Sequence, residues 1–118
     1  MTDCGKTVVV IDDEEDVRDM LRFFLESEGY TVEVASDGVE GLALLGRVTH
    51  PCFILLDLLM PNMDGYEFRR RQVADPSLAD IPVFVSTSAT EKLPADLPLI
   101  PKPVDPDVLL QAVKHACG

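Results

Sequence analysis

Residues 8–16 read VVVIDDEED, and this stretch places four aliphatic side chains directly before five consecutive acids. Val8 to Ile11 is apolar throughout, as is typical of a strand buried inside a sheet. Asp12 to Asp16 follow without a compensating base, and like charges this close repel one another. A core strand that ends in so much negative charge raises the question of which positive charge offsets it.

Length and composition favour one globular domain, residues 1–118. Hydrophobic residues make up 47% of the chain, which suffices for a core and argues against disorder. Twenty-one acids against ten bases give a net charge of -11. This excess argues against direct binding to nucleic acid, which depends on lysine and arginine. Cations and basic protein surfaces are more natural partners, although ordinary solubility explains the charge equally well.

The cysteines and the N-terminus indicate the compartment. Cys4, Cys52 and Cys117 lie far apart and form no C-x-x-C pair, so neither a zinc site nor a redox motif is expected. We expect free thiols, as in a reducing cytosol. Residues 1–6 lack the apolar stretch of a signal peptide, and the longest apolar run is far short of the ~20 residues that cross a bilayer. These features predict a cytoplasmic protein with no membrane association.

Apolar runs alternate with helical patterns along the chain. Strands are expected at Thr7–Ile11, Thr31–Ala35, Cys52–Leu56, Pro82–Ser86 and Leu99–Ile100. Helices are expected from about Val17 to Glu28, and at Val39–Arg47, Tyr66–Val73 and Pro106–Ala116. Met20 in the first helix and Val108 in the last belong to the predicted inward faces. This alternation predicts a parallel sheet with helices on both faces.

Polar residues follow four of the expected strands. Asp12 and Asp13 follow the first, Asp57 the third, Thr87 the fourth and Lys102 the fifth. In parallel sheets, ligands bind beyond the carboxyl ends of the strands, where these residues would meet. Mg²⁺ prefers oxygen ligands, usually one or two carboxylates with waters and a substrate phosphate. The pattern therefore predicts a magnesium site at which a carboxylate takes up a phosphoryl group.

Four motifs, VVVIDDEED, ILLDLLMPNMDG, PVFVSTSA and LIPKPV, occur in an order that resembles the receiver domains of bacterial two-component response regulators. They span almost the whole chain, and the D-x-x-M-P-x-M-D-G stretch is highly specific. The resemblance implies an α/β three-layer sandwich. Its sheet would have five parallel strands of flavodoxin-like order 2-1-3-4-5.

The resemblance also assigns metal and acceptor roles. Asp57 is similar to the residue that accepts the phosphoryl group. Asp13, Asp57 and the backbone carbonyl of Leu59 would bind Mg²⁺ directly, and Asp12 would bind it through water. Glu14, Glu15 and Asp16 are instead expected to interact with the dipole of the following helix.

Further roles fall on the later motifs. Thr87 is similar to the switch hydroxyl that turns toward the phosphoryl group, although a shift of one residue would give this role to Ser88. Lys102 is similar to the lysine that contacts a phosphoryl oxygen, and the family has a cis peptide bond at the position of Lys102–Pro103. Leu99, where the family often has an aromatic residue, belongs to the expected output region together with Thr87 and Ser88.

The implied function is phosphorelay signalling. A sensor histidine kinase or a histidine phosphotransfer protein would donate the phosphoryl group, and a downstream target protein would bind the changed surface. The chain would catalyse only its own phosphorylation and dephosphorylation, so it is not expected to be an enzyme in the usual sense. A phosphorylation-independent interaction module is the alternative. A phosphatase is less favoured, because such enzymes carry their nucleophile after the first strand, in a D-x-D-x-T motif.

The segment 88–101 departs from the family pattern. It contains Pro94, Pro98 and Pro101, and proline inside a helix costs ~3 kcal/mol. We therefore predict that the family's fourth helix is short or missing. Because this helix commonly forms part of the output surface, an atypical output face is expected.

Overall fold

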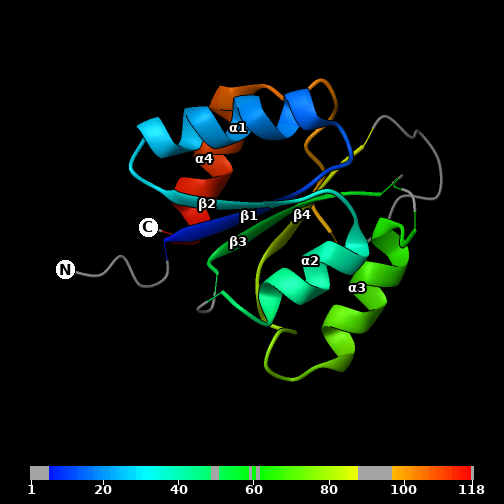
Figure 1. Ribbon diagram of the computed structural model, residues 1–118. Coiled ribbons are helices and arrows are strands. Elements are labelled where there is room, and N and C mark those ends of the chain that lie inside the picture. The colour runs from blue at the N-terminus through cyan, green and yellow to red at the C-terminus, as the bar shows by residue number, and fades with distance from the viewer. Residues whose placement is uncertain (1–5, 49–50, 59, 61, 88–96, 118) are drawn as a thin grey trace.

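Strands and helices alternate along the chain, as the hydrophobic pattern predicts (Figure 1). The computed structural model describes residues 6–48, 51–58, 60, 62–87 and 97–117. Its strands are β1 (Thr7–Ile11), β2 (Thr31–Ala35), β3 (Phe53–Asp57) and β4 (Val83–Ser86). Its helices are α1 (Glu15–Ser27), α2 (Gly38–Leu45), α3 (Gly65–Ala74) and α4 (Pro106–Cys117).

The strands form one parallel sheet in the order β2-β1-β3-β4. Ile11 aligns with Leu56 across β1 and β3, and Asp57 aligns with Ser86 across β3 and β4, so these strands end close to one another. Helices α1 and α4 cover one face of the sheet, and α2 and α3 cover the other (Figure 1). This arrangement confirms the predicted α/β sandwich and the flavodoxin-like strand order.

The expected fifth strand is reduced to a single bridge between Leu99 and Val85. The Val85 N–H donates to the carbonyl of Pro98 at 2.9 Å, and the Ile100 N–H donates to the carbonyl of Val85 at 2.8 Å. Pro98 and Pro101 have no N–H, so the pairing does not extend into a longer strand. The position beside β4 is nevertheless the one predicted. The predicted loss of a helix concerns residues 88–96, which lie outside the described ranges.

Separate apolar cores lie on the two faces of the sheet. Leu21 and Leu25 of α1 and Leu109 of α4 are fully buried on one face, and Phe68 of α3 is fully buried on the other. Burial of such a side chain contributes roughly 1.5–3 kcal/mol. Within the described ranges, no helix has the length and apolar character needed to span a membrane.

The predicted inward faces of α1 and α4 are wrong at one position each. Met20 is 46% exposed and Val108 is 49% exposed. Met20 lies at the edge of its helix's apolar stripe, next to the buried Leu21. In α4 the buried stripe is rotated, so that Leu110 contacts the core in place of Val108.

The expectation of free thiols is also wrong for two of the three cysteines. A disulfide joins Cys52 and Cys117, whose Cα atoms are 5.3 Å apart. The reason lies in the topology: β3 begins at the edge of the sheet where α4 ends (Figure 1). The sequence separation of 65 residues gave no indication of this proximity. Cys4 lies outside the described ranges.

Candidate functional site

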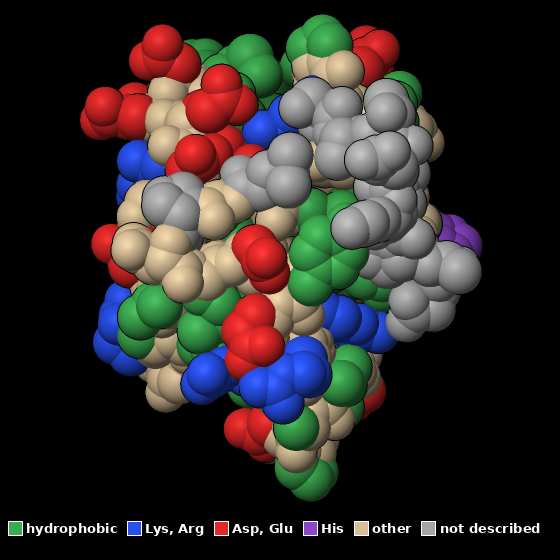
Figure 2. Space-filling model, turned by 90° about the vertical axis from the view of Figure 1, so that its right-hand side faces the viewer, with side chains coloured by type: hydrophobic (Ala, Val, Ile, Leu, Met, Phe, Trp, Pro, Cys, Tyr) green, Lys and Arg blue, Asp and Glu red, His purple; other side chains and the backbone are tan. Residues whose placement is uncertain are grey.

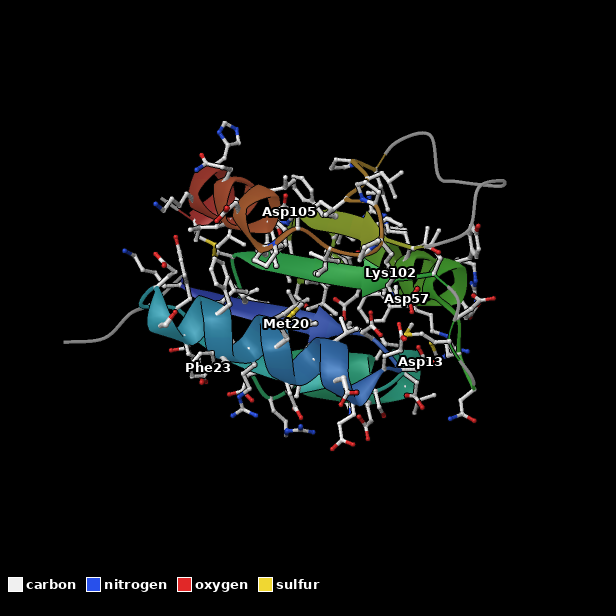
Figure 3. The ribbon with its side chains drawn as sticks, turned by 90° about the horizontal axis from the view of Figure 1, so that it is seen from above. Asp13, Met20, Phe23, Asp57, Lys102 and Asp105 are labelled. Atoms are coloured by element: carbon white, nitrogen blue, oxygen red, sulfur yellow. A yellow bond between two sulfur atoms is a disulfide. The ribbon has the colours of Figure 1, made fainter. Side chains whose placement is uncertain are left out.

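The carboxylates of Asp12, Asp13 and Asp57 meet beyond the carboxyl ends of β1 and β3. One oxygen from each carboxylate lies within 4.8 Å of the others. Asp12 and Asp57 are buried, whereas Asp13 is exposed to solvent. Figure 3 shows Asp13, Asp57 and Lys102 at the same end of the sheet. The acidic cluster, defined as these three aspartates, can therefore be reached by a cation from one side.

The ammonium group of Lys102 supplies the positive charge inside the acidic cluster. Its Nζ lies 2.8 Å from Asp12 Oδ2, 3.0 Å from Glu14 Oε1 and 3.3 Å from Asp57 Oδ2. Burial alone would lower the pKa of Lys102. The hydrogen bonds to Asp12 and Glu14 and the charges of Asp12 and Asp57 outweigh burial, so this pKa lies above its ordinary value. The lysine therefore stays charged at neutral pH. The Lys102–Pro103 peptide bond is cis.

Glu14 belongs to the site, although the sequence predicted only a dipole interaction for it. It precedes α1, its N–H donates to Asp12 Oδ1 at 2.8 Å, and its carboxylate contacts Lys102. Glu15 and Asp16 lie in the first turn of α1, as expected. Nothing in the sequence distinguishes Glu14 from these neighbours. Its contact with the lysine follows from the turn that the Glu14 N–H closes with Asp12.

Hydrogen bonds fasten the loop after β3 to the start of α2. Asp37 is the N-cap of α2 and accepts a 2.8 Å hydrogen bond from the Glu40 N–H. The same carboxylate accepts a 2.7 Å hydrogen bond from Asn62 Nδ2. The hydrogen bonds from Glu40 and Asn62 hold the pKa of Asp37 below its ordinary value. Asp37 therefore stays ionised and holds the loop that follows Asp57.

Gly65 allows α3 to begin directly against the end of β3. A Cβ at this position would lie 2.7 Å from the carbonyl oxygen of Asp57 and 2.7 Å from the Cα of Leu58. Both atoms belong to the backbone, which cannot move aside cheaply. Asp64, just before it, is the N-cap of α3. The Asp64-Gly65 pair therefore serves the close packing of β3 and α3.

Two hydroxyl side chains lie at the end of β4. Thr87 follows the strand and is buried, as is Ser86. Ser86 aligns with Asp57 in the sheet, and its Oγ has no hydrogen-bond partner among the described residues. Sequence reasoning missed Ser86, because strand alternation alone does not show which hydroxyl lies beside Asp57.

The other predicted site residues are placed only in part. Leu59, the expected carbonyl ligand, and Ser88, the alternative switch residue, lie outside the described ranges. Leu99 is 42% exposed and forms the bridge to Val85 of β4. The structure therefore brings together Asp12, Asp13, Asp57 and Lys102 from the predicted set, with Thr87 at the end of the neighbouring strand.

Charge is unevenly distributed over the end of the molecule shown in Figure 2. Acidic side chains gather in the upper part of this view, on the side of α1 and α4. Most of the visible lysine and arginine side chains lie lower, on the side of α2 and α3. Such a separation favours the approach of a cation or a basic surface to the acidic side.

Known proteins resemble this chain in sequence. The family model described as the response regulator receiver domain matches residues 8–114. An uncharacterized 14.6 kDa protein of Leptolyngbya boryana is 36% identical over 93% of this chain and 88% of its own length. The response regulator MprA of a Mycobacterium species is 41% identical over 69% of this chain, but this match covers only 34% of the regulator. The matched part of the chain thus spans about a third of the length of such regulators.

Solved structures resemble it over nearly the whole chain. The signal receiver domain of a signal transduction histidine kinase from Syntrophus aciditrophicus has a TM-score of 0.83 and 31% identity, covering 95% of this chain and 89% of that one. The chemotaxis protein CheY4 of Vibrio cholerae has a TM-score of 0.82 and 28% identity, covering 93% and 97%. The fold, the acidic cluster and these matches agree: the chain belongs to the family of response regulator receiver domains.

Proposed function

We propose that this chain is a phosphorelay receiver that takes a phosphoryl group onto Asp57. The donor is a phosphohistidine of a sensor histidine kinase or of a histidine phosphotransfer protein. The observation that carries the proposal is the acidic cluster with Lys102 Nζ 3.3 Å from Asp57 Oδ2. It supports the proposal because a buried carboxylate, which would be the nucleophile, lies beside a fixed cation and the exposed Asp13. Such donors act in the cytoplasm, where we place this chain.

The residues fit a bound Mg²⁺. Asp12, Asp13 and Asp57 offer only oxygen donors, and one oxygen of each lies within 4.8 Å of the others. This is the hard-ligand set that Mg²⁺ prefers, with positions left for water and phosphate. The three negative charges of these aspartates also exceed the single positive charge of Lys102, which leaves room for a cation. Bound Mg²⁺ would neutralise charge on the phosphoryl oxygens during transfer.

The protein's own groups perform the transfer. An oxygen of the Asp57 carboxylate attacks the phosphorus in line with the scissile P–N bond, a new P–O bond forms, and the imidazole leaves and takes up a proton. The Lys102 ammonium binds a phosphoryl oxygen and offsets its charge. The buried Thr87 hydroxyl then donates to the bound phosphoryl group. To make this hydrogen bond, the Thr87 side chain turns toward the phosphoryl group. This rotation alters the surface after β4, which a downstream target protein binds.

The proposal is tested by intact-mass spectrometry after incubation with acetyl phosphate, a small donor. With Mg²⁺ we expect a gain of one phosphoryl group per chain, and with excess chelator no gain, because the carboxylates then repel the donor. A control reaction with inorganic phosphate in place of acetyl phosphate gives no gain. Equal phosphorylation with and without Mg²⁺ would contradict the role of the acidic cluster. Failure to take up phosphate under any condition would favour the phosphorylation-independent module.

A groove beside the acidic cluster is suited to the donor protein. It has a volume of about 500 Å³ and is lined by Glu14, Val17, Met20, Lys102, Pro103 and Val104. Met20 on α1 and Asp105 just before α4 lie on the same face of the sheet (Figure 3). The groove is mainly apolar, and its charged lining residues, Glu14 and Lys102, lie at the site. We propose that the phosphohistidine protein packs against it while its histidine reaches Asp57.

Met20→Glu is expected to slow transfer from a phosphohistidine protein at least tenfold, because it adds a charge where an apolar surface should be buried. Its uptake of phosphate from acetyl phosphate should stay within twofold of the wild type. Val73→Glu is the matched control: Val73 is 46% exposed, as Met20 is, but lies on α3 across the sheet. Rates are measured by phosphotransfer from a purified phosphorylated donor. An equal effect of both variants would exclude this groove.

A further inference from the structure

The Cys52–Cys117 disulfide joins the far ends of the two elements that frame the site. Cys52 directly precedes β3, whose last residue is Asp57, and Cys117 is the last residue of α4. Helix α4 begins four residues after Lys102. The disulfide therefore lies at the end of the sheet where β3 begins, and the acidic cluster lies at the end where β3 stops. None of the proposed phosphoryl chemistry uses it.

The backbone around Cys52 is restrained more tightly than the backbone around Cys117. The Cys52 N–H donates to the Thr7 carbonyl at 2.9 Å, which fixes this backbone to β1. Helix α4 is held mainly by Leu109 and Val113, which are fully buried. Its last turn packs against the core through Ala116 and Cys117, both only partly buried. The covalent bond is thus a strong restraint on the last turn of α4.

The position of the cysteines permits exchange with small thiols. Both residues are only partly buried, so the disulfide lies at the margin of the core rather than in its interior. In the cytoplasm, the compartment that follows from the proposed function, disulfides are rare and are usually transient or redox-sensing. A pair that meets at 5.3 Å between Cα atoms needs no backbone movement to form or break the bond.

We propose that Cys52 and Cys117 are a redox-responsive modification site that fastens or releases the C-terminal turn of α4. In oxidation, one cysteine thiolate attacks a small disulfide such as oxidised glutathione, forms a mixed disulfide and expels one glutathione thiolate. The second cysteine thiolate then attacks the protein sulfur of the mixed disulfide and expels the second glutathione. Two protein thiols are oxidised, one glutathione disulfide is reduced, and the two protons pass to the released thiols.

The expected consequence is a change in stability and in local order. A cross-link that closes a long loop restricts the unfolded chain, so the oxidised form should melt roughly 10 °C higher than the reduced form. Amide exchange in the last turn of α4 should be at least tenfold slower when the disulfide is formed. The acidic cluster lies at the other end of the sheet, so phosphate uptake from acetyl phosphate should change less than twofold.

The test equilibrates the full chain in glutathione buffers from reducing to oxidising, labels free thiols under denaturing conditions and counts the labels by intact mass. We expect three labels in reducing buffer and one in oxidising buffer, with the peptide map joining Cys52 to Cys117. The Cys4→Ser variant should show the same transition with one label fewer throughout. In Cys117→Ser, the melting temperature should not respond to reductant.

Three results would overturn the proposal. They are three free thiols in oxidising buffer, a cross-link that involves Cys4, or a wild-type melting temperature that reductant leaves unchanged. Thiol counting needs no phosphate uptake, so its result stands even if Asp57 accepts no phosphoryl group. Conversely, phosphorylation of a chain with three free thiols would leave the proposed function intact.

Discussion

Asp57→Asn is expected to abolish uptake of a phosphoryl group from acetyl phosphate and from a phosphohistidine protein. Asparagine keeps the shape of the side chain but lacks the anionic oxygen that attacks phosphorus. It also removes one of the three carboxylates that would hold Mg²⁺. The variant should still fold, because Lys102 remains paired with Asp12 and Glu14. Intact mass spectrometry and thermal melting report these two properties separately.

Asp64→Asn is the control for this result. Asp64 follows Asp57 in the same motif but acts as the N-cap of α3, and asparagine caps a helix about as well as aspartate. This variant should take up phosphate at a rate close to that of the wild type. A folded Asp57→Asn protein that still gains one phosphoryl group would show that another residue is the acceptor.

The sequence predicted the components of the site because they follow the strands. Asp12, Asp13 and Asp57 come directly after apolar runs that are recognisable as core strands, and a parallel sheet places such residues at one edge. Lys102 was predicted from the Lys-Pro motif. The strand that leads to this lysine was overestimated, since the prolines around Leu99 limit the pairing to one bridge.

Features that depend on packing between distant elements could not be predicted. The contact between Glu14 and Lys102 depends on the turn at Asp12, and three adjacent acids look alike in the sequence. The disulfide depends on where α4 ends relative to β3, which the spacing of cysteines does not encode. Met20 is exposed because it lines the groove beside α1. A periodic pattern predicts the centre of an apolar stripe better than its edges, so the exposure of Met20 could not be predicted.

Lys102→Met is expected to lower the stability of the metal-free protein by on the order of 3 kcal/mol, because it removes the cation from a buried cluster. The side chains of Asp12 and Asp57 are 4% and 5% exposed, so water does little to screen their repulsion. The melting temperature should fall by roughly 10 °C. Phosphorylation should also slow on the order of 10²-fold, because the phosphoryl oxygens lose a positive contact.

Saturating Mg²⁺ should raise the melting temperature of Lys102→Met by more than that of the wild type. In the wild type the lysine ammonium competes with the metal for the same carboxylates, 2.8 Å from Asp12 and 3.3 Å from Asp57. In the variant the metal replaces the positive charge that the lysine gave these carboxylates, so its binding contributes more to folding. Lys114→Met, on the exposed side of α4, changes the net charge equally and should respond to Mg²⁺ as the wild type does. Thermal melting with and without Mg²⁺ tests this prediction. Equal increases in melting temperature for wild type and Lys102→Met would mean that lysine and metal bind the cluster independently.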